Sequence, residues 1–182
     1  VHGARAAVSP SAALPALDPD RPGVVVAGPW RGSPHAWHAH LDALILWQRR
    51  SGWPVLADPL SGLRGQAQLT CVGGYDLLLE SPDPVLAPSQ VLRLGSLPAS
   101  RRLERWLAGL DAEQMLVSEG DSRPLDPRAV VRAQTAAGLW AWVGGQLNGP
   151  SVAPSAAACR LANSWRDAEA RLQALLDQSL ST

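Results

Sequence analysis

The sequence predicts an α/β domain of three layers, in which helices cover both faces of a mostly parallel sheet of five to six strands. Short apolar runs rich in Val and Leu alternate with segments whose apolar residues recur every three or four positions. The runs are continuous rather than interrupted by polar residues, which is typical of parallel strands buried on both faces. Such an alternation favours right-handed crossovers between neighbouring parallel strands.

The first strand is predicted at 24–28, where the run VVVAG follows the turn-rich segment DPDRPG. Ser33 can cap a helix that follows. The apolar residues of this helix recur at helical spacing, at Trp37, Leu41, Leu44, Ile45 and Trp47. This pattern predicts an amphipathic helix packed on the sheet.

The next two strands are predicted at 52–58 (GWPVLAD) and 89–95 (SQVLRLG). Between them, residues 59–68 (PLSGLRGQAQ) contain Pro, Ser and Gly and predict a loop. Residues 75–81 (YDLLLES) predict a short helix.

A helix is expected at 98–110, and a fourth strand at 113–119 (EQMLVSE). Residues 123–133 (RPLDPRAVVRA) predict a loop and a short fifth strand, and residues 135–145 (TAAGLWAWVGG) predict a helix. The helix at 98–110 carries its apolar residues on one face, at Leu103, Trp106, Leu107 and Leu110.

Four segments are expected along the chain. Residues 1–22 are rich in Ala, Pro and Ser and indicate a linker, and residues 23–146 form the central α/β domain. Residues 147–157 indicate a second linker, and residues 158–182 a C-terminal helix that leads toward a further domain. Apolar residues of this helix recur at Leu161, Trp165, Ala168, Leu172, Leu175 and Leu176.

Composition excludes several classes of function. The 182 residues include 16 basic and 16 acidic side chains, so no overall charge favours binding to nucleic acid or to an anionic membrane. No apolar run approaches the ~18 residues of a membrane span. Cys71 and Cys159 lack the spacing of metal ligands or of a disulfide framework, which suits a cytoplasmic protein.

Two motifs resemble ligand sites only weakly. Gly28 and Gly32 follow the first strand in VVVAGPWRGS, but the spacing is not GxGxxG and the chain has no lysine for a phosphate-binding loop. We interpret this segment as a Gly-Pro turn. His35, His38 and His40 in HAWHAH cannot converge on one metal ion from a single helix, so a solvated helix face is expected.

Asp58 follows the second predicted strand. This is the edge where open α/β sheets place their ligand crevice. The alternative is that Asp58 caps the turn before Pro59. Either role suits a short carboxylate at this position.

A candidate anion-binding group follows the third strand. Arg101 and Arg102 lie in the first turn of a helix, where cations are disfavoured by about 0.3–1 kcal/mol each. Together with Ser96 and Ser100 and the free N–H groups of the helix start, they could bind a carboxylate. The alternative is that Arg101 pairs with Glu104 and that Arg102 is exposed.

Four segments resemble the central domain of the MenD family, and they occur in the right order at the right separation. This family contains the thiamine-diphosphate-dependent 2-succinyl-5-enolpyruvyl-6-hydroxy-3-cyclohexene-1-carboxylate synthases. The resemblance covers about residues 23–178. Its segments are GWPVLADPLSGLR (52–64), YDLLLES (75–81), QVLRLGSLPASRRLERWL (90–107) and DSRPLDP (121–127).

The resemblance implies a Rossmann-like central domain of a three-domain transferase. Thiamine diphosphate and Mg²⁺ or Mn²⁺ would lie between the two other domains of a homodimer or homotetramer, and the C-terminal helix would lead toward a missing cofactor-binding domain. The enzyme would decarboxylate 2-oxoglutarate and add the succinyl carbanion to isochorismate, for menaquinone or phylloquinone biosynthesis.

The resemblance also implies which residues of this chain matter. Arg101 and Arg102 match a basic pair, often Lys then Arg, that helps to hold the carboxylates of the substrates. The GDG motif that holds metal and diphosphate is absent, the nearest string being EGDSRP at 119–124, so no catalytic, cofactor-binding or metal-binding residue is expected here. Two other hypotheses are a regulatory module that binds an anion or a nucleotide, and a purely structural spacer.

Overall fold

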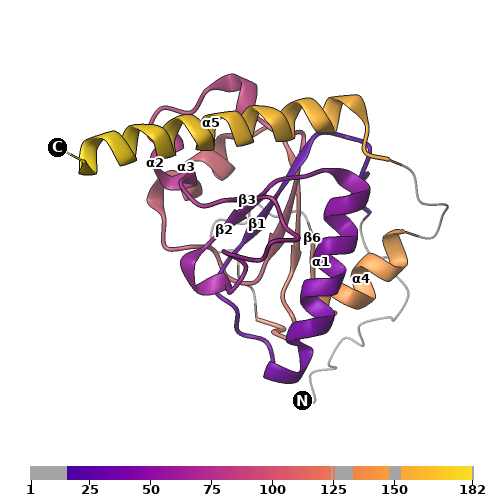
Figure 1. Cartoon of the computed structure of the whole chain (residues 1–182). Coiled ribbons are helices and arrows are strands. Elements are labelled where there is room, and N and C mark those ends of the chain that lie inside the picture. The colour runs from indigo at the N-terminus through magenta and orange to yellow at the C-terminus, as the bar shows by residue number, and fades with distance from the viewer. Residues whose placement is uncertain (1–15, 124, 126–132, 148–152, 182) are drawn as a thin grey trace, which may run out of the picture.

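The computed structural model describes residues 16–123, 125, 133–147 and 153–181. Within them, six parallel strands form one sheet in the order β3-β2-β1-β4-β5-β6, which confirms the predicted α/β fold (Figure 1). The strands are β1 (Gly23–Ala27), β2 (Val55–Ala57), β3 (Cys71–Val72), β4 (Gln90–Leu94), β5 (Glu113–Val117) and β6 (Ala133–Thr135).

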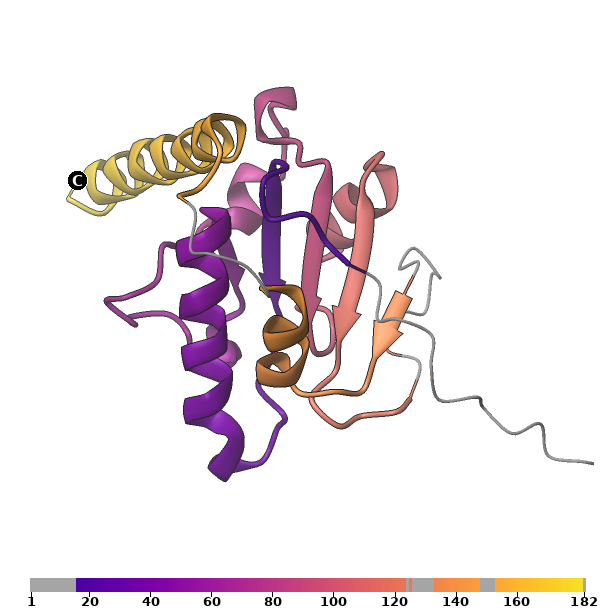
Figure 2. The ribbon, with the colours of Figure 1, turned by 90° about the vertical axis from the view of Figure 1, so that its right-hand side faces the viewer.

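Helices cover both faces of this sheet, and α1 and α4 lie together on one of them (Figure 2). The opposite face is covered by α2, α3 and α5. The helices are α1 (Trp37–Ser51), α2 (Tyr75–Leu78), α3 (Arg101–Gly109), α4 (Leu139–Gln146) and α5 (Ala156–Leu180), with short 3-10 helices η1 (Pro34–Ala36), η2 (Pro59–Ser61) and η3 (Pro84–Leu86).

The central strands are buried on both sides, as their continuous apolar runs predict. Val25 of β1 packs in the core under α1 and α4, whereas its neighbour Val26 packs in the core under α2, α3 and α5. Successive side chains of a strand point to opposite faces, so one run of Val serves two cores. Trp47 of α1 and Trp142 of α4 lie 5.0 Å apart between ring centroids and are fully buried.

Within the described residues, one strand was not predicted from the sequence. Cys71 and Val72 form β3 and pair with Val55 and Leu56 of β2. Two residues are too few to show a periodic pattern, so only the pairing with β2 identifies this strand. Of residues 123–133, predicted to form a loop and a short fifth strand, residues 124 and 126–132 lie outside the described residues, and β6 begins at Ala133.

Two predicted linkers contribute to the packing where the structure describes them. Leu17 is buried, and the indole N–H of Trp53 donates to the Arg21 carbonyl at 2.8 Å. At the other end, α5 begins at Ala156, two residues before the expected start, and the Ser155 hydroxyl accepts from the Ala158 N–H at 3.1 Å. Residues 1–15 and 148–152 of these segments lie outside the described residues.

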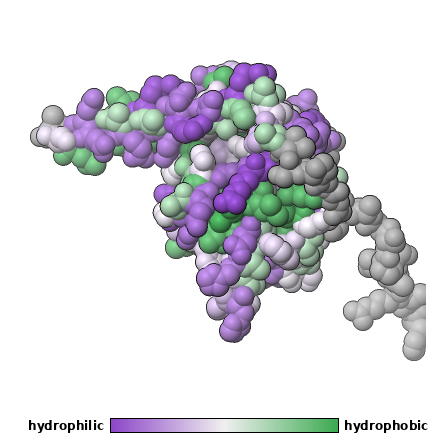
Figure 3. Space-filling view, turned by 45° about the vertical axis from the view of Figure 1, so that its right-hand side comes forward, coloured by the Kyte–Doolittle hydropathy of each residue, from purple (hydrophilic) through white to green (hydrophobic). Residues whose placement is uncertain are grey.

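The first half of α5 belongs to the folded body. Leu161 and Trp165 are buried in the core that α2 and α3 share, and the indole N–H of Trp165 donates to the Leu86 carbonyl at 3.1 Å. Further along α5, Glu169 accepts from the backbone N–H groups of Gly73 and Gly74, and the C-terminal end of the helix projects from the body with a mainly hydrophilic surface (Figure 3). Among the described residues, no helix combines the length and the apolar character needed to cross a membrane.

Candidate functional site

A crevice of about 540 Å³ opens at the carboxyl ends of β1, β4 and β5. The chain leaves β1 toward β2 on one side, and β4 returns on the other side of β1, so β1 and β4 flank the topological switch point of the sheet. Open α/β sheets bind ligands at such a point. Polar and aromatic side chains line the crevice, among them Trp30, Arg31, Ser96, Glu119, Asp121 and Arg123.

Close backbone packing shapes the floor of this crevice. The Gly28 N–H donates to the Leu94 carbonyl at 3.0 Å, and a Cβ atom added at Gly28 would lie 1.6 Å from the Ser96 carbonyl oxygen. Gly95 has a φ of +67°, which favours glycine. Glycine at position 28 is therefore required by the close approach of the Ser96 backbone.

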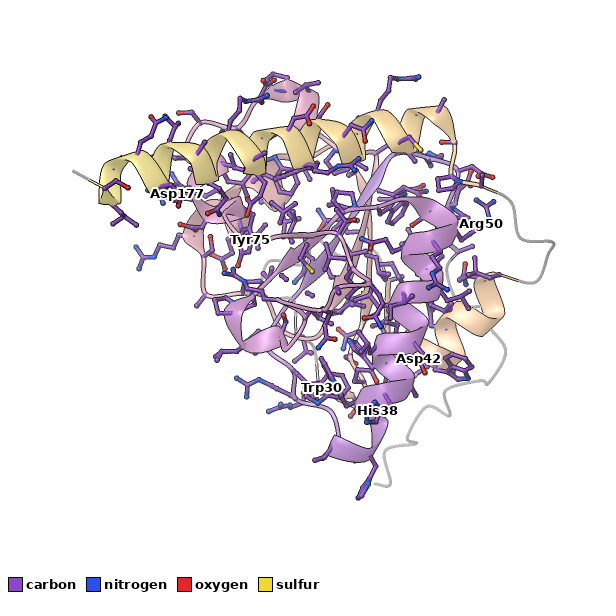
Figure 4. The ribbon with its side chains drawn as sticks, viewed as in Figure 1. Trp30, His38, Asp42, Arg50, Tyr75 and Asp177 are labelled. Carbon is purple, nitrogen blue, oxygen red and sulfur yellow. The ribbon has the colours of Figure 1, made fainter. Side chains whose placement is uncertain are left out.

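An aromatic cluster and a buried polar pair form one wall. The ring centroids of Trp30 and His40 lie 4.5 Å apart, and His40 Nδ1 lies 2.8 Å from Glu119 Oε1. Trp30 lies at the same end of the molecule as the N-terminal turns of α1, where His38 also lies (Figure 4). The expectation of a solvated histidine face holds for His35 and His38, which are exposed, but it is wrong for His40, which is buried.

The charges of the crevice are largely paired. Arg123 Nη2 lies 2.6 Å from Asp121 Oδ2, and this hydrogen bond, with a smaller contribution from the charge of Arg31, lowers the pKa of Asp121 to about 2. The Glu119 carboxylate accepts from His40 and from the Leu139 N–H at 2.7 Å. Both carboxylates are therefore engaged, and no three His, Cys, Asp or Glu side chains of the described ranges group as metal ligands.

The predicted anion-binding residues divide between two places. Ser96 lines the crevice, whereas Ser100 and Arg102 meet the carboxylate of Asp76, which lies on α2. Ser100 is the N-cap of α3, since its hydroxyl accepts from the Leu103 N–H at 3.0 Å. Arg101 is exposed.

Asp76 and Glu80 are the anions beside the basic pair. Arg102 donates from Nη1 to Asp76 Oδ2 at 2.8 Å and from Nη2 to Glu80 Oε1 at 3.1 Å. The guanidinium of Arg102 is thus paired and partly covered rather than merely exposed. Pairing with carboxylates of its own chain is the arrangement expected if Arg102 has a structural role, and Arg102 does not line the crevice. The partners lie 22 and 26 residues away, and no local sequence pattern marks them.

Asp58 adopts the capping role. Its carboxylate accepts from the Leu60 N–H at 2.7 Å and caps η2, and the side chain is buried. It does not line the crevice that Trp30 and Ser96 share. Among the residues that the structure brings to the crevice, Trp30, His40 and Glu119 were not identified as a group from the sequence, because they lie on three separate segments.

A family model described as the middle domain of thiamine pyrophosphate enzymes matches residues 10–180. The chain belongs to this middle-domain family. This middle domain is 48% identical over 168 residues to the 2-succinyl-5-enolpyruvyl-6-hydroxy-3-cyclohexene-1-carboxylate synthase of Synechococcus sp. (strain RCC307). The aligned residues are 92% of this chain and 28% of the relative.

Two further synthases of the same name are similar to this middle domain. That of Synechococcus sp. (strain CC9311) is 52% identical over 129 residues, covering 70% of this chain and 22% of the relative. The synthase of Parasynechococcus marenigrum (strain WH8102) is 51% identical over 138 residues, which are 74% of this chain and 24% of the relative. These similarities confirm the resemblance to the MenD central domain, and the chain spans less than a third of the length of these relatives.

The residues of this middle domain do not fit the diphosphate and metal of the cofactor. The GDG motif is absent from the sequence, and in the nearest string, EGDSRP, the Asp121 carboxylate is taken by Arg123. We therefore assign no contact with thiamine diphosphate or with Mg²⁺ to the residues that the structure describes.

Proposed function

We propose that the full-length protein is a synthase that joins a four-carbon unit of 2-oxoglutarate to isochorismate. 2-Oxoglutarate loses CO₂, and the resulting succinyl carbanion forms a new C–C bond with isochorismate. The observation that carries this proposal is the identity of 48% over 92% of this chain to a synthase of that name. The product would serve menaquinone or phylloquinone biosynthesis.

The cofactors belong to other parts of the proposed enzyme. Thiamine diphosphate supplies the carbanion chemistry when bound, and Mg²⁺ or Mn²⁺ holds its diphosphate, in domains that this chain does not contain. The C-terminal helix α5 would lead toward one of them. A cytoplasmic homodimer or homotetramer is the assembly that the family resemblance favours.

Arg101 and Arg102 are the residues of this chain that we propose to bind substrate. Both lie at the start of α3 on the surface of the domain, and Arg102 is only partly covered. A charge-assisted hydrogen bond to a carboxylate is worth about 1.5–3 kcal/mol, more than the helix-dipole penalty of a cation in the first turn. Ser100 would contribute through the backbone of the helix start, because its hydroxyl is engaged with Asp76 and the Leu103 N–H. Ser96 would bind an anion separately, in the crevice.

Steady-state kinetics of the full-length enzyme test these assignments. With thiamine diphosphate and Mg²⁺ present, CO₂ release and product formation should require both 2-oxoglutarate and isochorismate. Arg102→Ala should lower kcat/KM for one substrate by roughly 10- to 100-fold, because each 1.4 kcal/mol is a factor of ten. A folded full-length protein that binds cofactor but shows no turnover of the two substrates would refute the proposal.

The isolated middle domain provides a complementary test. It should be inactive, and calorimetry should detect no binding of thiamine diphosphate even with Mg²⁺. Tight cofactor binding by this chain alone would contradict the division of roles.

A second candidate function is the binding of a regulatory anion or nucleotide in the crevice. The position of the crevice at the switch point, with Trp30 for stacking and with Arg31 and Arg123 for charge, favours this alternative. Isothermal titration of the chain with ADP and with inorganic phosphate tests it. Binding that Arg31→Ala weakens would support a regulatory module, and heats equal to those of dilution would leave the crevice as a structural feature.

A further inference from the structure

Asp76 connects α2 to the start of α3 through two hydrogen bonds. Its Oδ1 atom accepts from the Ser100 hydroxyl, and its Oδ2 atom accepts from Arg102 Nη1 at 2.8 Å. Because Ser100 also caps α3, the carboxylate is fixed relative to the helix that carries Arg102. The two helices lie next to one another on the same face of the sheet (Figure 1).

The pairing leaves most donors of Arg102 free for a ligand. A guanidinium carries five N–H donors. Within the part of the chain that the structure describes, one N–H of Arg102 donates to Asp76 and another to Glu80. The Arg102 side chain is 32% exposed. The three remaining donors are the ones that an incoming carboxylate would have to bind for Asp76 to stay in place.

A fixed guanidinium binds a carboxylate at a lower entropic cost than a free one. An arginine side chain has many rotamers, and part of this conformational entropy is lost when the side chain is held in one geometry. Asp76 imposes that geometry before a ligand arrives. The Ser100 hydrogen bond, followed by that of Arg102, lowers the pKa of Asp76, so the carboxylate is ionised at neutral pH.

We infer that Asp76 is a positioning residue that holds the Arg102 guanidinium in the orientation needed to bind a substrate carboxylate. This inference rests on the proposed substrate contact of Arg102. It adds a residue that the family resemblance did not assign, and it explains why a carboxylate lies beside the arginine that is to bind another carboxylate.

Kinetics of five variants of the full-length enzyme test the inference: Asp76→Asn, Asp76→Glu, Arg102→Ala, the double variant of Asp76→Asn with Arg102→Ala, and Asp42→Asn. The amide of Asp76→Asn keeps an oxygen that can accept from Ser100, but it removes one of the two carboxylate charges that pair with Arg102, the other being that of Glu80. Asp42→Asn is the matched control, because Asp42 lies exposed on α1, on the opposite face of the sheet (Figure 4). Thermal unfolding of each variant verifies that it folds.

Asp76→Asn should raise KM roughly 3- to 10-fold for the substrate that Arg102→Ala affects, with kcat within about 2-fold. In the Arg102→Ala background, the same change should alter KM by less than about 2-fold, because no guanidinium remains to be positioned. Asp76→Glu should recover part of the lost affinity. Asp42→Asn should match the wild type.

The outcomes separate the inference from the proposed function. If Arg102→Ala lowers kcat/KM but Asp76→Asn leaves KM unchanged or lowers it, the positioning role is wrong and the substrate contact stands. Equal effects of Asp76→Asn with and without Arg102 would make Asp76 a structural residue and overturn the inference. If Arg102→Ala has no kinetic effect, the substrate contact itself is wrong, and the inference falls with it.

Discussion

Nδ1 of His40 lies 2.8 Å from Oε1 of Glu119, 79 residues further along the chain. An ionised carboxylate can only accept, so Nδ1 carries the proton and donates. The same oxygen accepts from the Leu139 N–H at 2.7 Å, at the start of α4. Glu119 itself has a φ of +51°. One side chain thus joins α1, the loop after β5 and the start of α4 beside the crevice.

Glu119→Ala should destabilise the chain by about 2–3 kcal/mol, because it removes a charged acceptor and leaves the buried His40 donor without it. Urea denaturation followed by tryptophan fluorescence measures this loss. Asp111→Ala, at an exposed position, should change the free energy of unfolding by less than about 0.5 kcal/mol. A Glu119→Ala protein as stable as this control would show that the pair contributes little.

Gly28→Ala should destabilise the fold by about 2–3 kcal/mol, because the new Cβ atom would lie 1.6 Å from the Ser96 carbonyl oxygen and the two loops must separate. Gly144→Ala provides the opposite control, since a Cβ atom there meets nothing within 4 Å and alanine favours the helix by about 0.5–1 kcal/mol. In thermal unfolding, Gly144→Ala should have the highest melting temperature, the wild type an intermediate one and Gly28→Ala the lowest. A wild-type melting temperature for Gly28→Ala would contradict the tight approach.

Trp165→Ala should cost about 3–5 kcal/mol, because the indole is fully buried and packs on Trp106 with ring centroids 5.7 Å apart. Leu175, further along α5, is 60% exposed, and Leu175→Ala should cost less than about 0.5 kcal/mol. Chemical denaturation of both variants tests whether a buried residue of α5 stabilises the domain more than an exposed one further along the helix. Similar losses for the two would refute that difference.

The carboxyl group of Asp121 should titrate near pH 2, because the Arg123 guanidinium stabilises its ionised form. The folded pKa is below the unfolded value of 3.8, so the stabilisation is present above about pH 4 and is lost as the pH falls toward 2. NMR titration of the side-chain carboxyl carbon measures the pKa directly. In Arg123→Ala it should return toward 3.8, and an unchanged value would exclude Arg123 as the cause.

Local patterns in the sequence determined much of this domain. The continuous run at 24–28 identified a strand buried on both faces, and the periodic leucines of α3 identified the face that it buries. Asp58 could be recognised as a cap because its partner, the Leu60 N–H, is two residues away. Burial patterns and caps depend on neighbours within about one helical turn, so a single sequence reveals them.

Only the tertiary structure decided the contacts between residues that lie far apart in the sequence. Cys71 and Val72 form a strand only because β2 lies beside them, and His40 is buried because the loop after β5 brings Glu119 to α1. The anion expected near Arg102 is Asp76, 26 residues earlier on another helix. Each of these contacts depends on how separate elements pack against the same sheet. No residue spacing along the chain encodes that packing.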